Sequence, residues 1–405
     1  MTAKKKKLPC LVFGNGITAL GVVRSLGRAG IISYCAENNI ADVKFSRWFK
    51  PLPSGSSTLG PSDTSVADFI ATTNIPSAVL IPCSDDFALK IAKLPPELKS
   101  QFPSIQPPES ALRSCIDKGA FATVLTACGV PHPKSYAFSE SKQFSEIPDD
   151  FFRSSFLKPR DSQSFFRKYG VKARKVYSRE EAVRSFEEFT RAGMSMLFQE
   201  YIPGPPSNHY FVDGYVDSSG TLRALFARQR TRMYPPDFGN SSYMTAVPLH
   251  QVAPAQESLA KIFVALNYRG IFSAEFKKDQ RDGSLRILEI NARPWWFIEF
   301  AARCGVNVCE LLYRDATGES LPSMPRYAIG QSCVNLYYDW HAAQDLIRTG
   351  ELSRTAVLFS WVRAKKTLFC IDDPLPSLAW FSSSVMRKLS RRFSAEQTAM
   401  QPRKA

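Results

Sequence analysis

The sequence predicts two architectures in succession: an α/β unit with a parallel sheet, and then an α+β region with an antiparallel sheet. Near the N-terminus an apolar strand, a helix and a second apolar strand follow one another, which is the order of a parallel β-α-β unit. From about residue 196 onward, strand-like segments succeed one another with few helices between them, which indicates antiparallel pairing. The 405 residues suffice for two or three packed units.

The N-terminal unit is predicted from short apolar runs. Strands are expected at residues 8–13, 31–35 and 78–81. Between the first two strands apolar residues recur at helical spacing, and Gly30 is placed to end that helix.

The turn after the first strand, Gly14-Asn15-Gly16, resembles the start of a dinucleotide-binding fingerprint. Position 19 is alanine where a third glycine is usual, and Glu37 lies near the place of the acid that closes the second strand. A tight strand-to-helix turn needs glycines with or without a phosphate. An NAD(P)-dependent oxidoreductase is therefore an alternative interpretation, which leaves the motifs further along the chain unexplained.

The rest of the chain is predicted from the same periodicities. Helices are expected at residues 120–128 and 179–192, and strands at residues 156–159, 196–201, 210–216, 222–228, 272–278 and 285–291.

Cysteine and histidine usage argues against a histidine- or thiolate-bound metal. The nine cysteines include no C-x-x-C pair, and the four histidines form no ligand motif. Reduced, buried thiols are expected. No run reaches the roughly 20 apolar residues of a spanning helix, so the sequence predicts a cytoplasmic protein.

The formal net charge of +15 would suit a nucleotide, a nucleic acid or an anionic membrane. Much of the excess lies at the ends, in Lys4 to Lys7 and after Arg387. A non-enzymatic basic protein that binds nucleic acid or membrane is therefore a second alternative. Apolar residues between Trp380 and Phe393 fit an amphipathic helix, for which packing on the protein core is favoured over membrane contact.

The sharpest local signal is Glu289-Ile290-Asn291-Ala292-Arg293. Side chains of a strand repeat every second residue, so the Glu, Asn and Arg point together while Leu288 and Ile290 point into a core. Glu275 meets Glu289 if the two strands pair. Mg²⁺ takes oxygen ligands from one or two carboxylates and from substrate phosphates, which this arrangement supplies. Taken alone, the motif equally fits two solvated carboxylates on a hairpin.

Two lysines and an abrupt strand end strengthen the metal interpretation. Lys158 ends an apolar strand, and Lys118 precedes the helix expected at residues 120–128. Residues 198–204 alternate as a strand and stop abruptly, as a hinge segment would. The exposed backbone of such a hinge can hydrogen-bond an adenine edge.

The ordered set of motifs resembles the ATP-grasp superfamily over roughly residues 8–320. The motifs are Asp117-Lys118, Leu157-Lys158-Pro159, Gln199-Glu200-Tyr201-Ile202-Pro203-Gly204, Glu275-Phe276 and Glu289-Ile290-Asn291-Ala292-Arg293. The nearest likeness is to carboxylate-amine ligases of the D-aspartate ligase group. It extends to residues 228–236 and to Asp373-Pro374-x-Pro376.

The resemblance implies a ligase that uses ATP and Mg²⁺, or Mn²⁺ in its place. Such an enzyme activates a small carboxylate as an acyl phosphate, joins it to an amine and releases ADP and phosphate. Related ligases are often dimers, so the resemblance leaves a homodimer open, and it implies no nucleic-acid partner.

The resemblance also implies a role for each motif residue. Lys118 and Lys158 would contact ATP phosphates, and the adenine hinge would consist of Glu200, Tyr201 and Ile202, with Asn208 near the ribose. The Mg²⁺ ligands would be Glu275, Glu289 and Asn291. The transferred phosphoryl group would be stabilised by Arg293 with one of Arg228, Arg230 or Arg232.

Four regions follow from the same resemblance. They are a Rossmann-like pre-ATP-grasp domain at residues 1–115, a small lid lobe at 116–195, a large lobe with the Mg²⁺ and ATP site at 196–325, and a helical extension with a basic tail at 326–405. The phosphate-covering loop at residues 161–170 is serine-rich where related proteins often have glycines.

Overall fold

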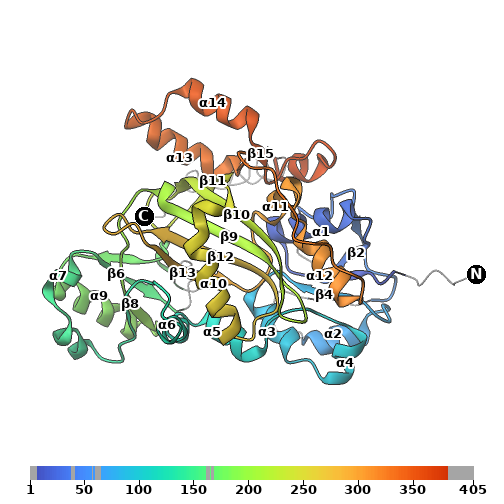
Figure 1. Ribbon diagram of the computed structural model, residues 1–405, viewed down its shortest axis with the longest axis horizontal. Helices are drawn as coiled ribbons and strands as arrows, with labels where there is room; N and C mark the ends of the chain where they lie inside the picture. The colour runs from blue at the N-terminus through green and yellow to red at the C-terminus, as the bar shows by residue number, and fades with distance from the viewer. Residues whose placement is uncertain are drawn as a thin grey trace, which may run out of the picture.

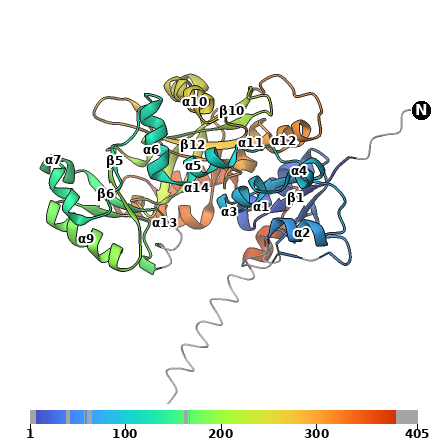
Figure 2. The same ribbon diagram turned by 90° about the horizontal axis from the view of Figure 1, so that it is seen from below.

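Three sheets organise the protein in the computed structural model, which describes residues 7–37, 42–56, 58–59, 65–160, 165 and 168–381 (Figure 1). A four-stranded sheet belongs to the N-terminal part, a seven-stranded sheet occupies the centre, and a second four-stranded sheet lies on the far side of the centre from the N-terminus (Figures 1 and 2).

The N-terminal sheet is parallel and has the strand order β3-β2-β1-β4. Its strands are β1 (Cys10–Phe13), β2 (Ser33–Cys35), β3 (Phe49–Lys50) and β4 (Val79–Pro82). Helix α1 (Gly16–Arg28) joins β1 to β2, which confirms the predicted β-α-β unit. Helices α2 (Val66–Thr72), α3 (Asp85–Ala92) and α4 (Pro96–Gln101) complete this part.

The central sheet runs β13-β12-β9-β10-β11-β14-β15 and is antiparallel except for the parallel pair β14–β15. Its strands are β9 (His209–Val216), β10 (Leu222–Tyr234), β11 (Asn240–Ala246), β12 (Gly270–Lys278), β13 (Leu285–Asn291), β14 (Ser332–Val334) and β15 (Lys365–Lys366). The antiparallel pairing predicted for β9, β10, β12 and β13 is confirmed.

Alternating side chains let this sheet bury both faces. On β9, Phe211 and Tyr215 pack with helices α1, α11 (Ile298–Cys304) and α12 (Val308–Ala316). Val212 and Val216, on the opposite face, pack with α5 (Glu109–Ile116), α6 (Lys118–Ala127) and α10 (Ala253–Ala265). Helix α1 is thus enclosed between the parallel and the central sheet, which explains why its residues from Thr18 to Leu26 are buried.

The third sheet has the order β5-β8-β6-β7 and is antiparallel. Its strands are β5 (Ser135–Tyr136), β6 (Ser155–Pro159), β7 (Arg174–Val176) and β8 (Met196–Glu200). Helices α7 (Asp149–Phe152) and α9 (Arg179–Arg191) cover it over a core rich in phenylalanine that includes Phe144, Phe152 and Phe198.

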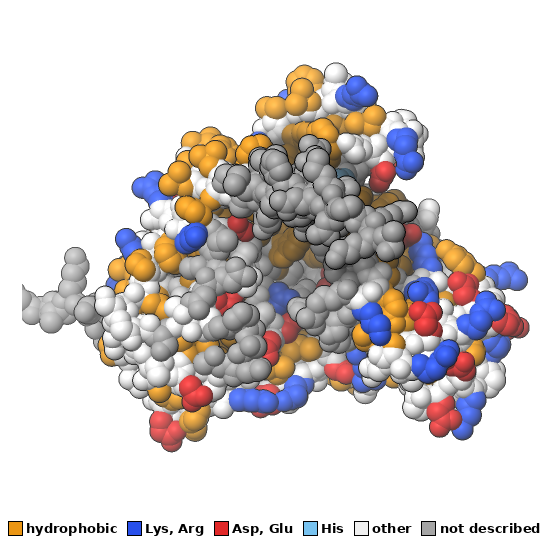
Figure 3. Space-filling model, turned by 180° about the vertical axis from the view of Figure 1, so that it is seen from behind, with side chains coloured by type: hydrophobic (Ala, Val, Ile, Leu, Met, Phe, Trp, Pro, Cys, Tyr) orange, Lys and Arg blue, Asp and Glu red, His pale blue; other side chains and the backbone are white. Residues whose placement is uncertain are grey.

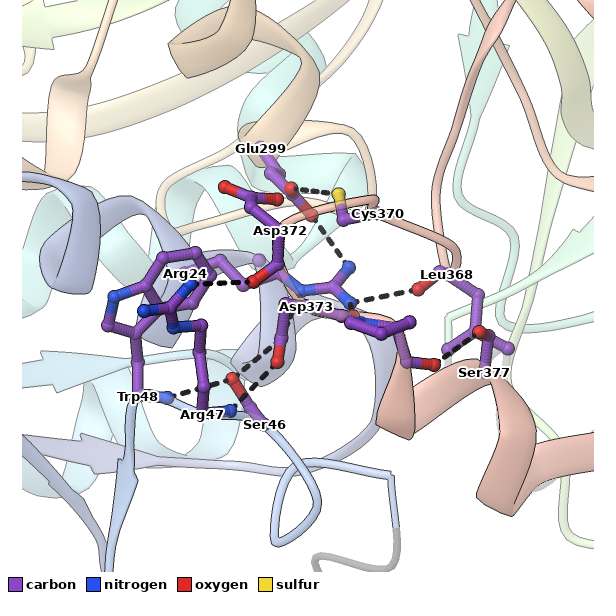
Figure 4. A network of polar contacts seen from close by, with 12 residues as sticks. Arg24, Ser46, Arg47, Trp48, Glu299, Leu368, Cys370, Asp372, Asp373 and Ser377 are labelled. Atoms are coloured by element: carbon purple, nitrogen blue, oxygen red, sulfur yellow. Dashed lines mark hydrogen bonds and ion pairs between the residues drawn. The ribbon is translucent and has the colours of Figure 1, made fainter.

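The C-terminal part returns to the rest of the molecule at two places. Strand β14 adds to the edge of the central sheet, and helices α13 (Leu336–Arg348) and α14 (Arg354–Arg363) project beyond that edge (Figure 1). The chain then reaches the N-terminal part, where Asp373 accepts a hydrogen bond from Arg24 of α1 (Figure 4). The predicted boundary at residue 325/326 stays a prediction.

Some predictions fall on residues that are not described. These are Lys4 to Lys6, most of the serine-rich loop after Lys158, and the amphipathic segment beyond Phe381. Among the described residues, none of the helices is long and apolar enough to span a bilayer.

Candidate active site

A cavity of about 460 Å³ lies between the third sheet and the central sheet. Near its middle, the face shown in Figure 3 is hollowed and carries charged side chains. Ten of the predicted site residues line the cavity: Lys118, Lys158, Glu200, Tyr201, Ile202, Arg230, Glu275, Glu289, Asn291 and Arg293. Residues as far apart in sequence as Lys118 and Arg293 therefore meet at one cavity, as the ordered motifs predict.

The hinge forms an aromatic end of the cavity. Phe238 lies with its ring centroid 4.7 Å from that of Phe156 and 6.0 Å from that of Tyr201. The Glu200 carboxylate is already engaged, because Oε1 pairs with Arg281 at 2.5 Å and Oε2 accepts from the Lys134 N–H at 3.1 Å. The Glu200 side chain therefore already has two partners within the protein.

Glu275 and Glu289 face each other across the β12–β13 pair, as the sequence predicts. Glu275 Oε1 lies 2.7 Å from His209 Nδ1 and 3.0 Å from Arg230 Nη2. Burial would raise the pKa of Glu275, but Arg230 and then His209 outweigh it and hold that pKa well below its usual range. Burial lowers the pKa of His209 to about 4, so at neutral pH the ring is neutral and donates from Nδ1.

Glu289 differs from Glu275 because it makes no ion pair with any described side chain. It accepts a weak hydrogen bond from Asn291 Nδ2 at 3.3 Å, and Asn291 Oδ1 accepts from Arg293 Nη2 at 3.3 Å. The Glu, Asn and Arg of the motif thus lie together, as their spacing predicts.

The strict alternation predicted for β13 is wrong at Leu288. A bulge interrupts the register, so that Glu275 faces Glu289 while the next residue, Phe276, faces Ile287. The extra residue is Leu288, which is half-buried and lines the cavity, whereas Ile290 is buried as predicted. The bulge brings an apolar side chain beside the two carboxylates.

The donor set suits Mg²⁺ that is shared with phosphates. Within the described ranges, no group of three or more His, Cys, Asp or Glu side chains could enclose a metal. Mg²⁺ usually takes one or two carboxylates plus substrate phosphates and keeps some of its waters. Glu289 and Asn291 both line the cavity and carry oxygen atoms of the kind that this pattern needs.

Three lysines, Lys118, Lys158 and Lys172, also line the cavity. Asp117 caps α6 by accepting from Gly119 N–H and Ala120 N–H, both at 2.9 Å, which fixes Lys118 at the first turn of the helix. Burial and the nearby Lys158 ammonium lower the pKa of Lys118. Lys172, whose pKa burial also lowers, donates to Asn240 of β11 at 2.5 Å. Buried cations held this close together favour a polyanionic ligand.

The three arginines of β10 have different partners, and this separates their roles. Arg228 pairs with Asp213 at 2.6 Å, and Arg232 with Asp339 at 2.6 Å, and neither lines the cavity. Arg230 lines it and reaches Glu275. Of the three alternatives, the structure therefore favours Arg230 as the partner of Arg293.

Asn208 also lies off the cavity lining. Its Nδ2 donates to the Lys278 carbonyl at 3.0 Å, which turns the amide toward the end of β12. The structure gives no support to a ribose contact by this side chain.

Among the charged and histidine side chains that line the cavity, three were not assigned by sequence reasoning: Asp85, His209 and Lys277. Asp85 begins α3 after β4 and accepts from Arg293 Nε at 2.7 Å. Its position at the carboxyl end of a parallel strand, where α/β sheets bind ligands, was the available signal. His209 and Lys277 lie on central strands and had no local signal.

The glycines after β1 serve the turn itself. A side chain at Gly14 would place its Cβ 2.7 Å from Cys83 Cβ, so glycine permits the close approach of β4. Glu37, the acid that a dinucleotide site would use, accepts from Asn15 Nδ2 at 2.9 Å. Packing therefore accounts for this segment without a bound dinucleotide.

Comparisons with known proteins identify the fold, although no family model matches the chain. The N5-carboxyaminoimidazole synthetase of Staphylococcus aureus superposes with a TM-score of 0.62 over 83% of this chain and 84% of its own, at 13% identity. The chain has the ATP-grasp fold.

Further proteins share the ATP-grasp fold with this chain. Biotin carboxylase of Campylobacter jejuni, solved as a β-γ-ATP complex, superposes with a TM-score of 0.59 over 79% of this chain and 73% of its own, at 19% identity. The L-amino acid ligase of Bacillus licheniformis superposes with a TM-score of 0.57 over 80% of this chain and 76% of its own, at 14% identity. In sequence, D-aspartate ligase of Enterococcus faecium (strain Aus0004) is 24% identical over 247 residues, and the match spans 58% of each protein.

Proposed function

We propose that this chain is an ATP- and Mg²⁺-dependent ligase that activates a carboxylate as an acyl phosphate and joins it to an amine. The observation that carries the proposal is one cavity that the Glu289–Asn291 pair lines together with Lys118 and Lys158. That combination provides oxygen ligands for one metal ion and cations for phosphates, which a solvated hairpin would not need.

The chemistry explains why such a site is useful. A carboxylate is a poor electrophile because its leaving group would be oxide, and phosphorylation by ATP supplies a better one. When bound, Mg²⁺ would neutralise charge on the phosphate oxygens. Arg230 and Arg293 are positioned to stabilise the transferred phosphoryl group, and the lysines to hold the remaining phosphates.

The second half of the reaction forms the new bond. The amine nitrogen attacks the carbonyl carbon of the acyl phosphate, the C–O bond to phosphate breaks, and inorganic phosphate leaves. Water must be kept from the acyl phosphate during this interval. The cavity between two sheets, with aromatic side chains at its hinge end, suits that requirement.

The names of the relatives guide the choice of substrates for a test. A D-aspartate ligase and an L-amino acid ligase are among the similar proteins, so amino acids come first as carboxylates and as amines. We expect one carboxylate–amine pair to stimulate ADP formation, with a product whose mass equals the sum of the two substrates less one water. ATP consumption without any such product across the panel would contradict ligation.

The location of the nucleotide is tested by two variants and calorimetry. Lys158→Ala should weaken ATP binding at least about tenfold, because it removes a cation from the phosphate wall. Gly16→Ala should leave ATP affinity unchanged and cost about 1 kcal/mol of stability, because Gly16 has φ +63° with open space where a Cβ would lie. The opposite pattern would place the nucleotide at the N-terminal turn.

A further inference from the structure

Exposed apolar side chains are concentrated in the C-terminal part of the protein. Of the 19 large hydrophobic side chains that are exposed in the described chain, 11 lie within residues 336–381. On α14, Leu358, Phe359 and Val362 are 61%, 68% and 69% exposed, and only Val357 is buried. Scattered exposed apolar residues are ordinary, but a concentration of this kind marks an interaction surface.

These residues belong to one connected surface. Trp340 of α13 stacks on Trp361 of α14 with ring centroids 6.0 Å apart, and Tyr337 of α13 meets Trp380 edge-on at 6.0 Å. We call α13, α14 and residues 374–381 together the C-terminal apolar surface. Helices α13 and α14 project from the body of the molecule in Figure 1, and Figure 3 shows hydrophobic side chains with Lys and Arg beside them on this projection.

The surface is held rigidly at its base. Asp339 of α13 is fully buried, pairs with Arg232 of the central sheet at 2.6 Å and accepts from Trp361 Nε1 at 2.6 Å. The exposed side chains are therefore presented by an anchored pair of helices, and their exposure is a stable property of the fold.

Composition indicates which partner covers this surface. Three of the six tryptophans lie in residues 336–381, and Arg354 and Arg363 flank the apolar stretch of α14. The 24 residues after Phe381 carry six Lys or Arg and a single acid, Glu396. Tryptophan and tyrosine beside basic residues are typical of proteins that lie in the interface of an anionic bilayer.

A second copy of the chain fits this surface less well. A two-fold dimer would place the same patch against itself, so both sides of the interface would carry the basic residues Arg354 and Arg363 in a chain of net charge +15. An anionic lipid surface instead complements these charges.

We propose that the C-terminal apolar surface docks the protein peripherally on anionic lipid bilayers. Leu358, Phe359 and Val362 enter the boundary between headgroups and acyl chains, and Arg354 and Arg363 meet the lipid phosphates. The docking surface lies outside the cavity, so it is independent of the proposed reaction.

The test uses the full chain and large unilamellar vesicles in a sedimentation assay. We expect binding to vesicles that contain phosphatidylglycerol, weaker binding to phosphatidylcholine alone, and weakening by salt. The triple change Leu358→Ser, Phe359→Ser, Val362→Ser should lower the partition coefficient at least about tenfold, because three apolar side chains leave the bilayer boundary.

A matched triple change serves as the control. Ile32, Tyr177 and Val264 are 54%, 64% and 84% exposed and lie on other elements, so changing all three to Ser should leave vesicle binding unchanged. Both triple variants should keep the melting temperature and ADP release of the parent. Arg354→Glu with Arg363→Glu should reduce binding to phosphatidylglycerol vesicles most strongly at low salt.

Three results would overturn the proposal. The first is that the folded protein does not bind phosphatidylglycerol vesicles at low salt. The second is that the α14 triple variant binds as the parent does. The third is a parent dimer in sedimentation velocity that this variant converts to monomer while vesicle binding stays the same, which would assign the surface to self-association.

Discussion

At the scale of single residues, the two carboxylates of the cavity differ in the side chains that contact them. Glu275 is held by Arg230 and His209, whereas Glu289 has only the Asn291 amide within hydrogen-bond distance among the described residues. Sequence reasoning found both carboxylates because each lies in a short motif. It could not find the Arg230–Glu275–His209 contacts, because these join β9, β10 and β12 through pairing that leaves no local pattern.

Lys277 gives a prediction for pH dependence. Burial, and then Arg230, lowers the pKa of Lys277 to about 8. Its ammonium lies 4.5 Å from the Tyr201 ring centroid, beside the hinge. A lysine with this lowered pKa is charged below pH 8 and loses the charge as pH rises through 8, so ATP affinity should fall from pH 7 to pH 9.

Calorimetry from pH 6.5 to 9.5 checks this prediction. The Lys277→Arg variant keeps its charge throughout, so its ATP affinity should change little with pH. The Lys277→Met variant lacks the charge at every pH, so its ATP affinity should be lower and should also change little with pH. An ATP affinity that falls with pH equally in the parent and in both variants would show that another group titrates.

At the scale of elements, strands could be predicted from the sequence where apolar residues alternate. Strand residues were missed where charged side chains interrupt that alternation. Strand β10 was expected to end at residue 228 but continues to Tyr234, through Arg228, Arg230 and Arg232. Each of these buried arginines has a carboxylate partner on another element, so the strand is stable only in the assembled sheet. Strand β11, Asn-Ser-Ser-Tyr-Met-Thr-Ala, was missed because its hydroxyl-rich sequence gives no such alternation.

The hairpin between β10 and β11 yields a prediction for the nucleotide base. Phe238 in this hairpin lies against Phe156, beside the hinge backbone. If adenine enters this aromatic end, Phe238→Ala should weaken ATP binding by about 1–2 kcal/mol while leaving the binding of inorganic triphosphate unchanged. Competition assays with the two ligands measure the difference. Equal loss for both would mean that Phe238 supports the phosphate wall instead.

At the scale of the whole molecule, one buried arginine joins the two ends of the described chain. Arg24 of α1 is fully buried and meets Glu299 at 3.1 Å, Asp373 at 2.9 Å and the Leu368 carbonyl at 2.9 Å (Figure 4). Sequence reasoning divided the chain into consecutive regions. It could not foresee that residues 349 positions apart share one ion network, since neither segment carries a sign of the other.

This network predicts a large stability effect from one change. Arg24→Met leaves the buried Asp373 carboxylate without its cation and Glu299 with Arg28 alone, and should cost about 3–5 kcal/mol of unfolding free energy. The combined change Arg24→Met, Glu299→Gln, Asp373→Asn should cost less, because it removes the buried charges as well. Urea unfolding of both, with Arg113→Met in the exposed Arg113–Glu109 pair as control, separates the cases. An Arg24 variant as stable as the control would contradict this account.

Under the proposed function, Glu289 and Asn291 hold the metal that an ATP-dependent reaction needs. Glu289→Gln keeps the size of the side chain and removes the charge, and no described ion pair depends on that charge, so the melting temperature should stay close to that of the parent. ADP release should fall by at least about a hundredfold, with only partial rescue by added magnesium. The decisive measurement is melting temperature and ADP release on the same Glu289→Gln preparation. A folded variant with the predicted loss supports the ligase site, and near-normal ADP release from it would contradict the account.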